Sequence, residues 1–309
     1  MGSVHELITR VGVEEARRRV PTTDRKIVDT AAAVLATESR AMGITYAGFC
    51  LTSLPHNELP DDQIWERHGH RVKLVVEPGR LPDHTGNMRL YGVPYGSRAR
   101  MIMIYLQSRA IQTNSPEVEL GQSMYEWMTR MGISDGGKQY RQVREQADRI
   151  SACHLTFVWS EEQGQRQRFS KDSIVKDGIQ LSSGDPKQLR LWVDTVRLSD
   201  SFFKALKEHP VPVWEPAMKL ISSKSMSIDL YVWLAYRLHV LTEPTPITWA
   251  ALYAQFGFSY QNLKHFKPRF IESLKMATAV YPEANVEVNE KGLVLRPSAP
   301  PIPQRKLLG

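Results

Sequence analysis

Cysteine is nearly absent from this chain of 309 residues, which has only Cys50 and Cys153. Two cysteines cannot form a disulfide framework, and such low usage is typical of a reducing compartment. The sequence has no run of 18 apolar residues, and its N-terminus lacks the apolar core of a secretory signal. We therefore expect a cytoplasmic protein without a membrane span.

The patterns of common catalytic and metal sites are also missing. No glycine-rich loop ends in Lys-Ser or Lys-Thr, so we predict no ATPase, and neither cysteine has a zinc ligand at the usual spacing. His68-Gly69-His70 resembles the His-hydrophobic-His pair of metal-dependent nicking enzymes, but its middle residue is glycine and spacing places no third ligand. Tyr260 and Lys264 resemble a Tyr-x-x-x-Lys pair but follow a helix-turn signal. We predict no catalytic residue, no metal and no cofactor.

What the chain does have is the composition of a basic globular protein. Hydrophobic residues make up 42% and charged residues 24% of it, which excludes a disordered chain, and its length allows two or three domains. The formal net charge is +7 and the pI is about 9.3. A positive excess of this size favours a polyanionic partner.

Residues 120–179 contain the pattern of two helices and a hairpin. Apolar residues in Leu120–Met131 recur at steps of four, three and four, which predicts a half-buried helix. Gly132 can take a positive φ at the end of that helix, and Ile133 can pack back as in a Schellman cap. A second helix, with a basic outer face, is expected to start near Lys138.

Two strands are expected after the basic helix. Residues 153–159 alternate between apolar and polar, residues 161–164 form a turn, and residues 166–179 return. A basic helix that follows a glycine-containing turn and precedes a hairpin is the order of a winged helix, whose recognition helix enters the major groove. Residues 138–171 include seven Lys or Arg against four Asp or Glu. The alternative interpretation is a solvated helix face with an ordinary hairpin.

The last third of the chain repeats this order. Residues 228–256 have the pattern of two helices ending at Gly257, and a third helix is expected from near Ser259. Pro268 predicts a kink in that helix, or a short first turn with a restart. Residues 286–295 predict a hairpin with a glycine in its turn. Two such modules in one basic chain favour nucleic-acid binding.

These patterns predict a fold that is mainly α with short β-hairpins (α+β), built from tandem winged-helix domains plus an N-terminal extension. The extension, with a helix and short strands, is expected at residues 1–95. The first winged-helix domain is expected at 96–208 and the second at 209–297. Residues 298–309 are expected to be a disordered tail.

The block Gly86–Arg100, GNMRLYGVPYGSRAR, resembles the signature of RepA-type plasmid replication initiators. The resemblance extends over roughly residues 20–297. Further segments that resemble the same family are residues 68–70, 118–121, 136–138 with 144–147, and 279–282.

The resemblance implies an initiator with tandem winged-helix domains that recognises repeated sequences, called iterons, in the double-stranded DNA of a plasmid origin. Such proteins open an AT-rich region and recruit the host's DnaA, helicase and loader. Many switch between a homodimer that represses or handcuffs origins and a monomer that initiates. Pro268 departs from the family pattern in the last recognition helix.

Side-chain chemistry predicts which residues contact DNA, since arginine can pair with guanine, glutamine with adenine, and glutamate can accept from cytosine. The expected base readers of the first module are Lys138, Arg141, Gln142 and Glu145, and its expected phosphate contacts are Arg149, Arg166, Arg168 and Lys171. The expected readers of the second module are Gln261, Lys264, His265 and Lys267, with Arg269 and Lys275 at phosphates. Tyr260 would stack on a sugar or bond a phosphate, or else pack at the start of its helix.

The function that we predict is sequence-specific binding to a plasmid origin, without enzymatic activity. The two recognition helices are expected in successive major grooves, about 10 base pairs apart, with binding that weakens steeply as salt rises. One alternative is a winged-helix transcriptional repressor without a recruiting role. The other is a metal-dependent enzyme that nicks the origin.

Overall fold

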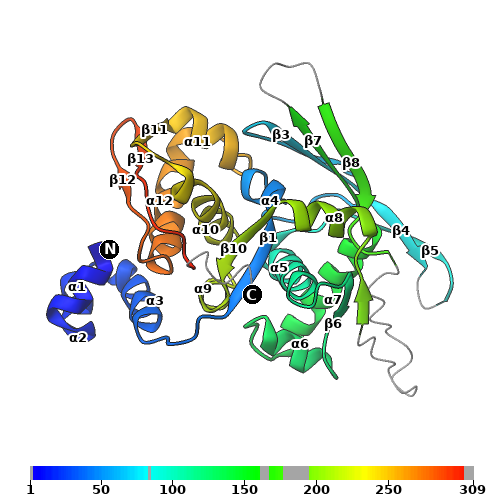
Figure 1. Ribbon diagram of the computed structural model, residues 1–309, viewed down its shortest axis with the longest axis horizontal. Helices are drawn as coiled ribbons and strands as arrows, with labels where there is room; N and C mark the ends of the chain where they lie inside the picture. The colour runs from blue at the N-terminus through cyan, green and yellow to red at the C-terminus, as the bar shows by residue number, and fades with distance from the viewer. Residues whose placement is uncertain (1–2, 83–84, 161–166, 177–194, 303–309) are drawn as a thin grey trace. The chain divides into compact units, whose positions relative to one another are not determined.

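The structure, a computed structural model, describes residues 3–82, 85–160, 167–176 and 195–302 (Figure 1). Its contacts divide the chain into two compact units. We call Gly43–Pro210 the central unit, and Met1–Met42 together with Val211–Gly309 the terminal unit. Residues 1–95, which were expected to form one N-terminal extension, are divided between the two units. Residues 1–42 belong to the terminal unit, and residues 43–95 belong to the central unit. Within the described residues, no helix is both long and apolar enough to cross a bilayer.

The central unit is built around helix α5, whose side chains are buried along most of its length. Its helices are α4 (Ala47–Leu51), α5 (Gly96–Gln112), α6 (Met124–Arg130), α7 (Gly137–Ala152) and α8 (Asp200–Glu208). Both α7 and α8 pack against α5. Strand β1 (Met42–Tyr46) leads into this unit.

A four-stranded antiparallel sheet completes the central unit, in the order β2-β3-β7-β8. Its strands are β2 (Trp65–Gly69), β3 (Val72–Glu77), β7 (His154–Ser160) and β8 (Gln167–Ser173). Two further pairs are β4 (Gly79–Pro82) with β5 (Met88–Tyr91), and β6 (Glu117–Glu119) with β9 (Thr195–Arg197). The hairpin predicted after the basic helix is therefore confirmed as β7 and β8, although its turn, residues 161–166, lies outside the described residues.

The turn between α6 and α7 forms as predicted. Gly132 has a φ of 69°, its amide donates to the carbonyl of Thr129 at 3.0 Å, and the amide of Ile133 donates to the carbonyl of Met128 at 2.9 Å. These are the two bonds of a Schellman motif, and Ile133 is buried beneath the turn. The start of α6 was predicted too early, at Leu120, because Ser123 caps the helix and accepts from the amide of Glu126.

The terminal unit contains the second module. Its helices are α1 (Ser3–Val11), α2 (Val13–Arg19), η1 (Thr22–Asp24), α3 (Arg25–Leu35), α9 (Glu215–Leu220), α10 (Ser225–Arg237), η2 (Leu238–Val240), α11 (Trp249–Phe256) and α12 (Leu263–Ala279). Strand β10 (Pro210–Trp214) precedes α9. Strands β11 (Thr245–Thr248), β13 (Gly292–Leu295) and β12 (Val286–Val288) pair antiparallel in that order, which confirms the predicted second hairpin.

Both ends of the chain are fixed to this unit within the described residues. The buried His5 ring is bonded through Nε2 to the carbonyl of Ala279 at 2.9 Å, so the first helix is part of the fold. Residues 298–302 do not match the expected disordered tail, since Ile302 is buried and the hydroxyl of Tyr281 donates to the carbonyl of Ala299 at 2.8 Å. Residues 303–309 lie outside the described part.

Helix α12 begins four residues later than predicted. Asn262 caps it, because its Oδ1 accepts from the amide of His265 at 3.0 Å, and the first helical residue is Leu263 rather than Ser259. The helix then continues through Pro268 to Ala279, so the expected restart at the proline does not occur.

Candidate nucleic-acid interface

The first half of α7 presents the side chains that sequence predicted as base readers. Lys138 and Arg141 are exposed and Gln142 is half-buried. Their side chains make no hydrogen bond or ion pair within the described part of the chain. Gly136 enters the helix with a φ of 140° and provides no side-chain cap for the first amides of α7. This end of the helix thus offers cations, an amide side chain and the positive end of the helix dipole to a partner.

The second half of α7 is used for internal structure. The side chain of Arg149 is only 6% exposed, and its guanidinium contacts Glu58 at 2.8 Å, Asp61 at 3.0 Å and Glu145 at 3.1 Å. This geometry ties residues 58–61 to α7 and leaves the Arg149 guanidinium unable to reach a phosphate. We correct the expectation for Arg149 on this ground.

Glu145 belongs to the same network. The hydroxyl of Tyr95 donates to Glu145 Oε1 at 3.1 Å, the oxygen that also accepts from Arg149. Burial and the Glu145 carboxylate both raise the pKa of Tyr95, which keeps its hydroxyl protonated as a donor. Because this carboxylate already has two donors, we leave both Glu145 and Arg149 out of the proposed DNA-binding set.

A second buried arginine, Arg100 in α5, has no local sequence pattern that predicts its burial. Its guanidinium donates to the carbonyls of Pro55 at 3.0 Å, Gly96 at 2.8 Å and Leu54 at 2.7 Å. Arg100 ends the block Gly86–Arg100 that carried the family resemblance. The block therefore forms β5, the start of α5 and part of the support beneath α7. The family resemblance pointed to this block, whereas no local sequence pattern indicated its structural role.

Asp148 lies on α7 beside two arginines. Burial raises its pKa to about 6, although the charges of Arg144 and Arg89 act in the opposite direction. Desolvation is thus the larger effect at this carboxyl. Arg89 is exposed and comes from the hairpin β4–β5, so cations from two elements meet along this side of the helix.

Two tyrosines flank the turn before α7. Tyr125 in α6 is 56% exposed, and Tyr140 in α7 is half-buried. Partial burial, followed by the nearby Asp135 and Tyr125, raises the pKa of Tyr140. Of these two tyrosines, Tyr125 is the exposed one, and its position beside the turn is seen only in the structure.

The hairpin β7–β8 places two further predicted residues by its register. Arg168 pairs with Trp159 and Lys171 pairs with Thr156, so both lie on the outermost strand of the sheet. Arg166 lies outside the described residues.

The start of α12 resembles the start of α7 in what it exposes. Lys264 and His265 are exposed in its first turn, and Gln261 is exposed just before it. None of the three side chains has a hydrogen bond or ion pair within the described residues. Tyr260 also precedes the helix, and its ring packs edge-on against Phe266 with centroids 5.6 Å apart. For Tyr260 this favours the packing role over contact with DNA.

Two further cations of α12, Lys267 and Arg269, have intramolecular contacts. The Lys267 ammonium lies 5.1 Å from the centroid of the Trp249 ring, and Arg269 forms an exposed ion pair with Glu272 at 3.2 Å. Exposed pairs of this kind are worth little and open readily.

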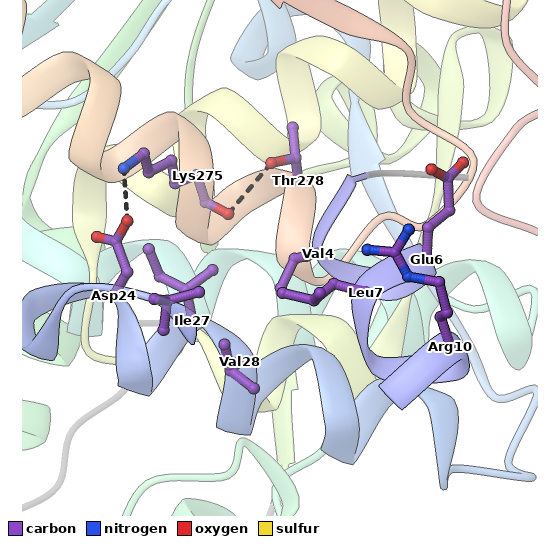
Figure 2. Close-up of a pocket in the computed structure, with 10 residues that line it drawn as sticks. Val4, Glu6, Leu7, Arg10, Asp24, Ile27, Val28, Lys275 and Thr278 are labelled. Atoms are coloured by element: carbon purple, nitrogen blue, oxygen red, sulfur yellow. Dashed lines mark hydrogen bonds and ion pairs between the residues drawn. The ribbon is translucent and has the colours of Figure 1, made fainter. Parts of the chain in front are cut away.

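Lys275 lies at a pocket between the N-terminal helices and α12, with a volume of about 580 Å³. Figure 2 shows its ammonium bonded to Asp24, and the distance is 2.7 Å. The same view shows Ile27, Val28, Val4 and Leu7 lining the pocket. Because 49% of the Lys275 side chain is exposed, a phosphate could compete with Asp24 for it.

His68 and His70 do not form part of a larger ligand set. Within the described residues, no group of three or more His, Cys, Asp or Glu side chains could hold a metal ion. Both histidines are exposed: His68 lies in β2 opposite Lys73, and His70 lies in the turn between β2 and β3.

Comparison with known proteins gives one family and one kind of solved structure. The family model described as "Plasmid encoded RepA protein" matches residues 93–250, just over half of the chain. No curated protein matches. Two crystal structures of domains 2 and 3 of RctB are similar to this chain, each at 12% sequence identity. The first has a TM-score of 0.48, and the match covers 79% of this chain and 94% of the RctB chain. The second has a TM-score of 0.40, and the match covers 80% of this chain and 93% of the RctB chain.

Proposed function

We propose that this chain, which belongs to the plasmid-encoded RepA family of replication initiators, recognises iteron repeats at a plasmid origin through α7 and α12. Both helices follow a turn, precede a hairpin and expose cations at their first turns. This is the arrangement of a winged helix, in which the recognition helix enters the major groove by its N-terminal residues. Each unit would read its own segment of the repeat.

The proposal rests on one observation: the exposed cations at the starts of α7 and α12 are not paired with acidic side chains of the described residues. Lys138, Arg141 and Lys264 have no anionic partner within the described residues, whereas Arg149 and Arg100 are fully engaged inside the central unit. Cations that stabilise no part of the fold are available to bind DNA. Their removal should therefore weaken binding without destabilising the protein.

The proposed contacts divide by chemistry. Base reading falls to Lys138, Arg141 and Gln142 in the central unit, and to Gln261, Lys264, His265 and Lys267 in the terminal unit. Phosphate contacts fall to Arg166, Arg168 and Lys171 on the first hairpin, and to Arg269 and Lys275 on α12.

The remaining parts of the proposal concern partners. As an initiator, the protein would recruit host DnaA, the helicase and its loader, and it would pass between a homodimer and a DNA-bound monomer. Light scattering with and without one repeat tests the second point, since a monomeric initiator predicts one protein mass per repeat. An unchanged dimer mass at every concentration would count against it. We propose no catalytic step for this chain.

The test of the central proposal uses the full chain and DNA from the plasmid origin. Footprinting first defines the protected repeat, and Lys138→Ala and Lys264→Ala are then each expected to raise Kd for it roughly tenfold at moderate salt. Lys204→Ala in α8 and Lys224→Ala before α10 are matched controls, because both lysines are exposed and belong to neither reading helix. Wild-type affinity in both test variants would show that the reading helices are wrongly placed.

Two further assays separate the rival functions, one for plasmid maintenance and one for DNA nicking. A repressor would give the same footprint but would not maintain a plasmid that carries the origin and this gene. A nicking enzyme would relax supercoiled origin DNA with Mg²⁺ or Mn²⁺, and the relaxation would disappear in the double variant His68→Ala, His70→Ala.

A further inference from the structure

The hairpin formed by β4 and β5 carries two arginines that the proposed interface does not include. Its strands pair from Gly79 opposite Tyr91 to Pro82 opposite Met88, and Figure 1 shows the hairpin projecting from the central unit. Arg80 and Arg89 are exposed. The sequence of residues 79–91 has one acidic residue, Asp83, which lies outside the described residues. Both strands pack against α7, the first reading helix.

The base of the hairpin is held tightly at the end of α7. A Cβ on Gly79 would lie 1.8 Å from the carbonyl oxygen of Ala152, and a Cβ on Gly92 would lie 2.5 Å from Nη1 of Arg149. The amide of Gly92 also donates to Asp61, the carboxylate that pairs with Arg149. Because these close approaches leave no room for a larger residue, the position of the hairpin is set by the same network that holds α7.

The two arginines lie on opposite faces of the hairpin. Arg89 pairs in register with Leu81, and Arg80 pairs with Leu90, so their side chains alternate. The Arg89 guanidinium lies 5.0 Å from the centroid of the Tyr91 ring and acts electrostatically on Asp148 in α7. It therefore faces the helix. Arg80 donates to the carbonyl of Met88 at 3.3 Å, and this is its only hydrogen bond to another described residue.

We propose that this hairpin is a further DNA-contacting element, in which Arg80 and Arg89 bind phosphates beside the groove that α7 enters. The inference rests on the proposed function of α7. The major groove is about 12 Å wide, so a helix within it has a phosphate backbone on each side. A guanidinium forms two parallel bonds to a phosphate, and stacking on Tyr91 restricts the conformations of Arg89 before binding. Phosphate contacts carry no sequence information, so the hairpin contributes affinity and leaves base preference to α7.

The test compares wild type with Arg80→Ala, Arg89→Ala in the full chain. The ligand is the duplex that footprinting defines at the origin, and Kd is measured at several salt concentrations. Loss of two phosphate contacts should reduce the slope of log K against log salt by about two, and should raise Kd roughly tenfold near physiological salt. The base preference of the protein should stay that of wild type.

Further variants keep the result interpretable. Arg89→Lys retains the charge and should keep a slope close to wild type, and Lys204→Ala is the control for loss of an unrelated cation. If the double variant is poorly folded by circular dichroism, Arg80→Ala alone should reduce the slope by about one. An unchanged slope in a folded variant would overturn the proposal for the hairpin. If Lys138→Ala binds normally as well, the placement of α7 itself fails, so the two failures can be told apart.

Discussion

Helices α7 and α12 are held in their units by different kinds of contact. The buried side of α12 is aromatic: the ring of Phe270 lies 5.0 Å from Phe266, 5.7 Å from Phe256 and 5.9 Å from Trp249. These three aromatic partners of Phe270 all come from residues 249–266, and α12 also packs against α3 near the other end of the chain. Helix α7 also has a buried apolar face that packs against α5, but it is tied in addition by Arg149, whose carboxylate partners Glu58 and Asp61 come from a loop far earlier in the sequence.

The difference shows why the two modules depend on different parts of the chain. The aromatic packing around Phe270 stabilises α12 through apolar burial, which does not depend on pairing between charged groups. A helix held by an arginine network depends on the loop at residues 58–61 and on the block Gly86–Arg100. The block Gly86–Arg100 thus supports α7. Within the described residues, no comparable block supports α12.

The largest expected effect comes from removing an aromatic ring from the α12 core. Phe270 is fully buried, so Phe270→Ala leaves a cavity and should cost about 3–5 kcal/mol of stability in the terminal unit. Hydrogen exchange measured residue by residue should show lost protection in α12 and a smaller change in α7. Val288→Ala is the control, since Val288 is 43% exposed and its loss should cost under about 0.5 kcal/mol. Equal loss of protection in both helices would contradict the comparison.

A smaller effect, in the other unit, is expected for Arg149→Met. This change removes the guanidinium from three carboxylates and should cost about 2–4 kcal/mol, with lost protection in α7 and in residues 58–61. Arg197→Ala removes an exposed pair with Glu117 and Asp200 and should change stability much less than Arg149→Met. If Arg149→Met has the stability of wild type, as Arg197→Ala is expected to have, the network does not hold α7.

The smallest of these effects is a pH dependence. The unfolded chain releases the Asp148 proton near pH 4, whereas burial in the folded state raises this pKa to about 6. The folded state therefore binds more protons between these values, and stability falls as pH rises through that window. Asp148→Asn should remove this loss and stabilise the central unit at pH 7.5 by an amount on the order of 2 kcal/mol. Urea unfolding at pH 4.5 and 7.5 measures it, and an equal difference between variant and wild type at both pH values would argue against the assignment.

Local patterns predicted the elements whose causes are local. Gly132 and Ile133 define a helix end by themselves, and the alternation in residues 153–159 defines a strand, so both were confirmed. The start of α12 was missed although its signal is short-range, because Asn262 was not recognised as the cap. Ser259, which also has a side chain that can cap a helix, lies closer to the preceding turn and was therefore the predicted start.

Long-range pairings could not be predicted in this way. Nothing near Arg149 in the sequence indicates that its charge is buried against Glu58, which is why a structural arginine was expected to bind phosphate. The same limit applies to His5, which bonds to Ala279 at the opposite end of the chain and brings the first helices into the terminal unit. Exposure at Lys138 and Lys264 was predicted correctly because helical periodicity alone separates an inner from an outer face.

The most direct test of α7 and α12 as reading helices is selection of binding sites from a random-sequence duplex library. Wild type, Gln142→Ala and Lys264→Ala would each be used as the full chain. We predict that each variant loses preference at one or two base pairs, at different positions for the two helices, while the rest of the selected site is retained. Selected sites identical to wild type at every position, for both variants, would contradict the account.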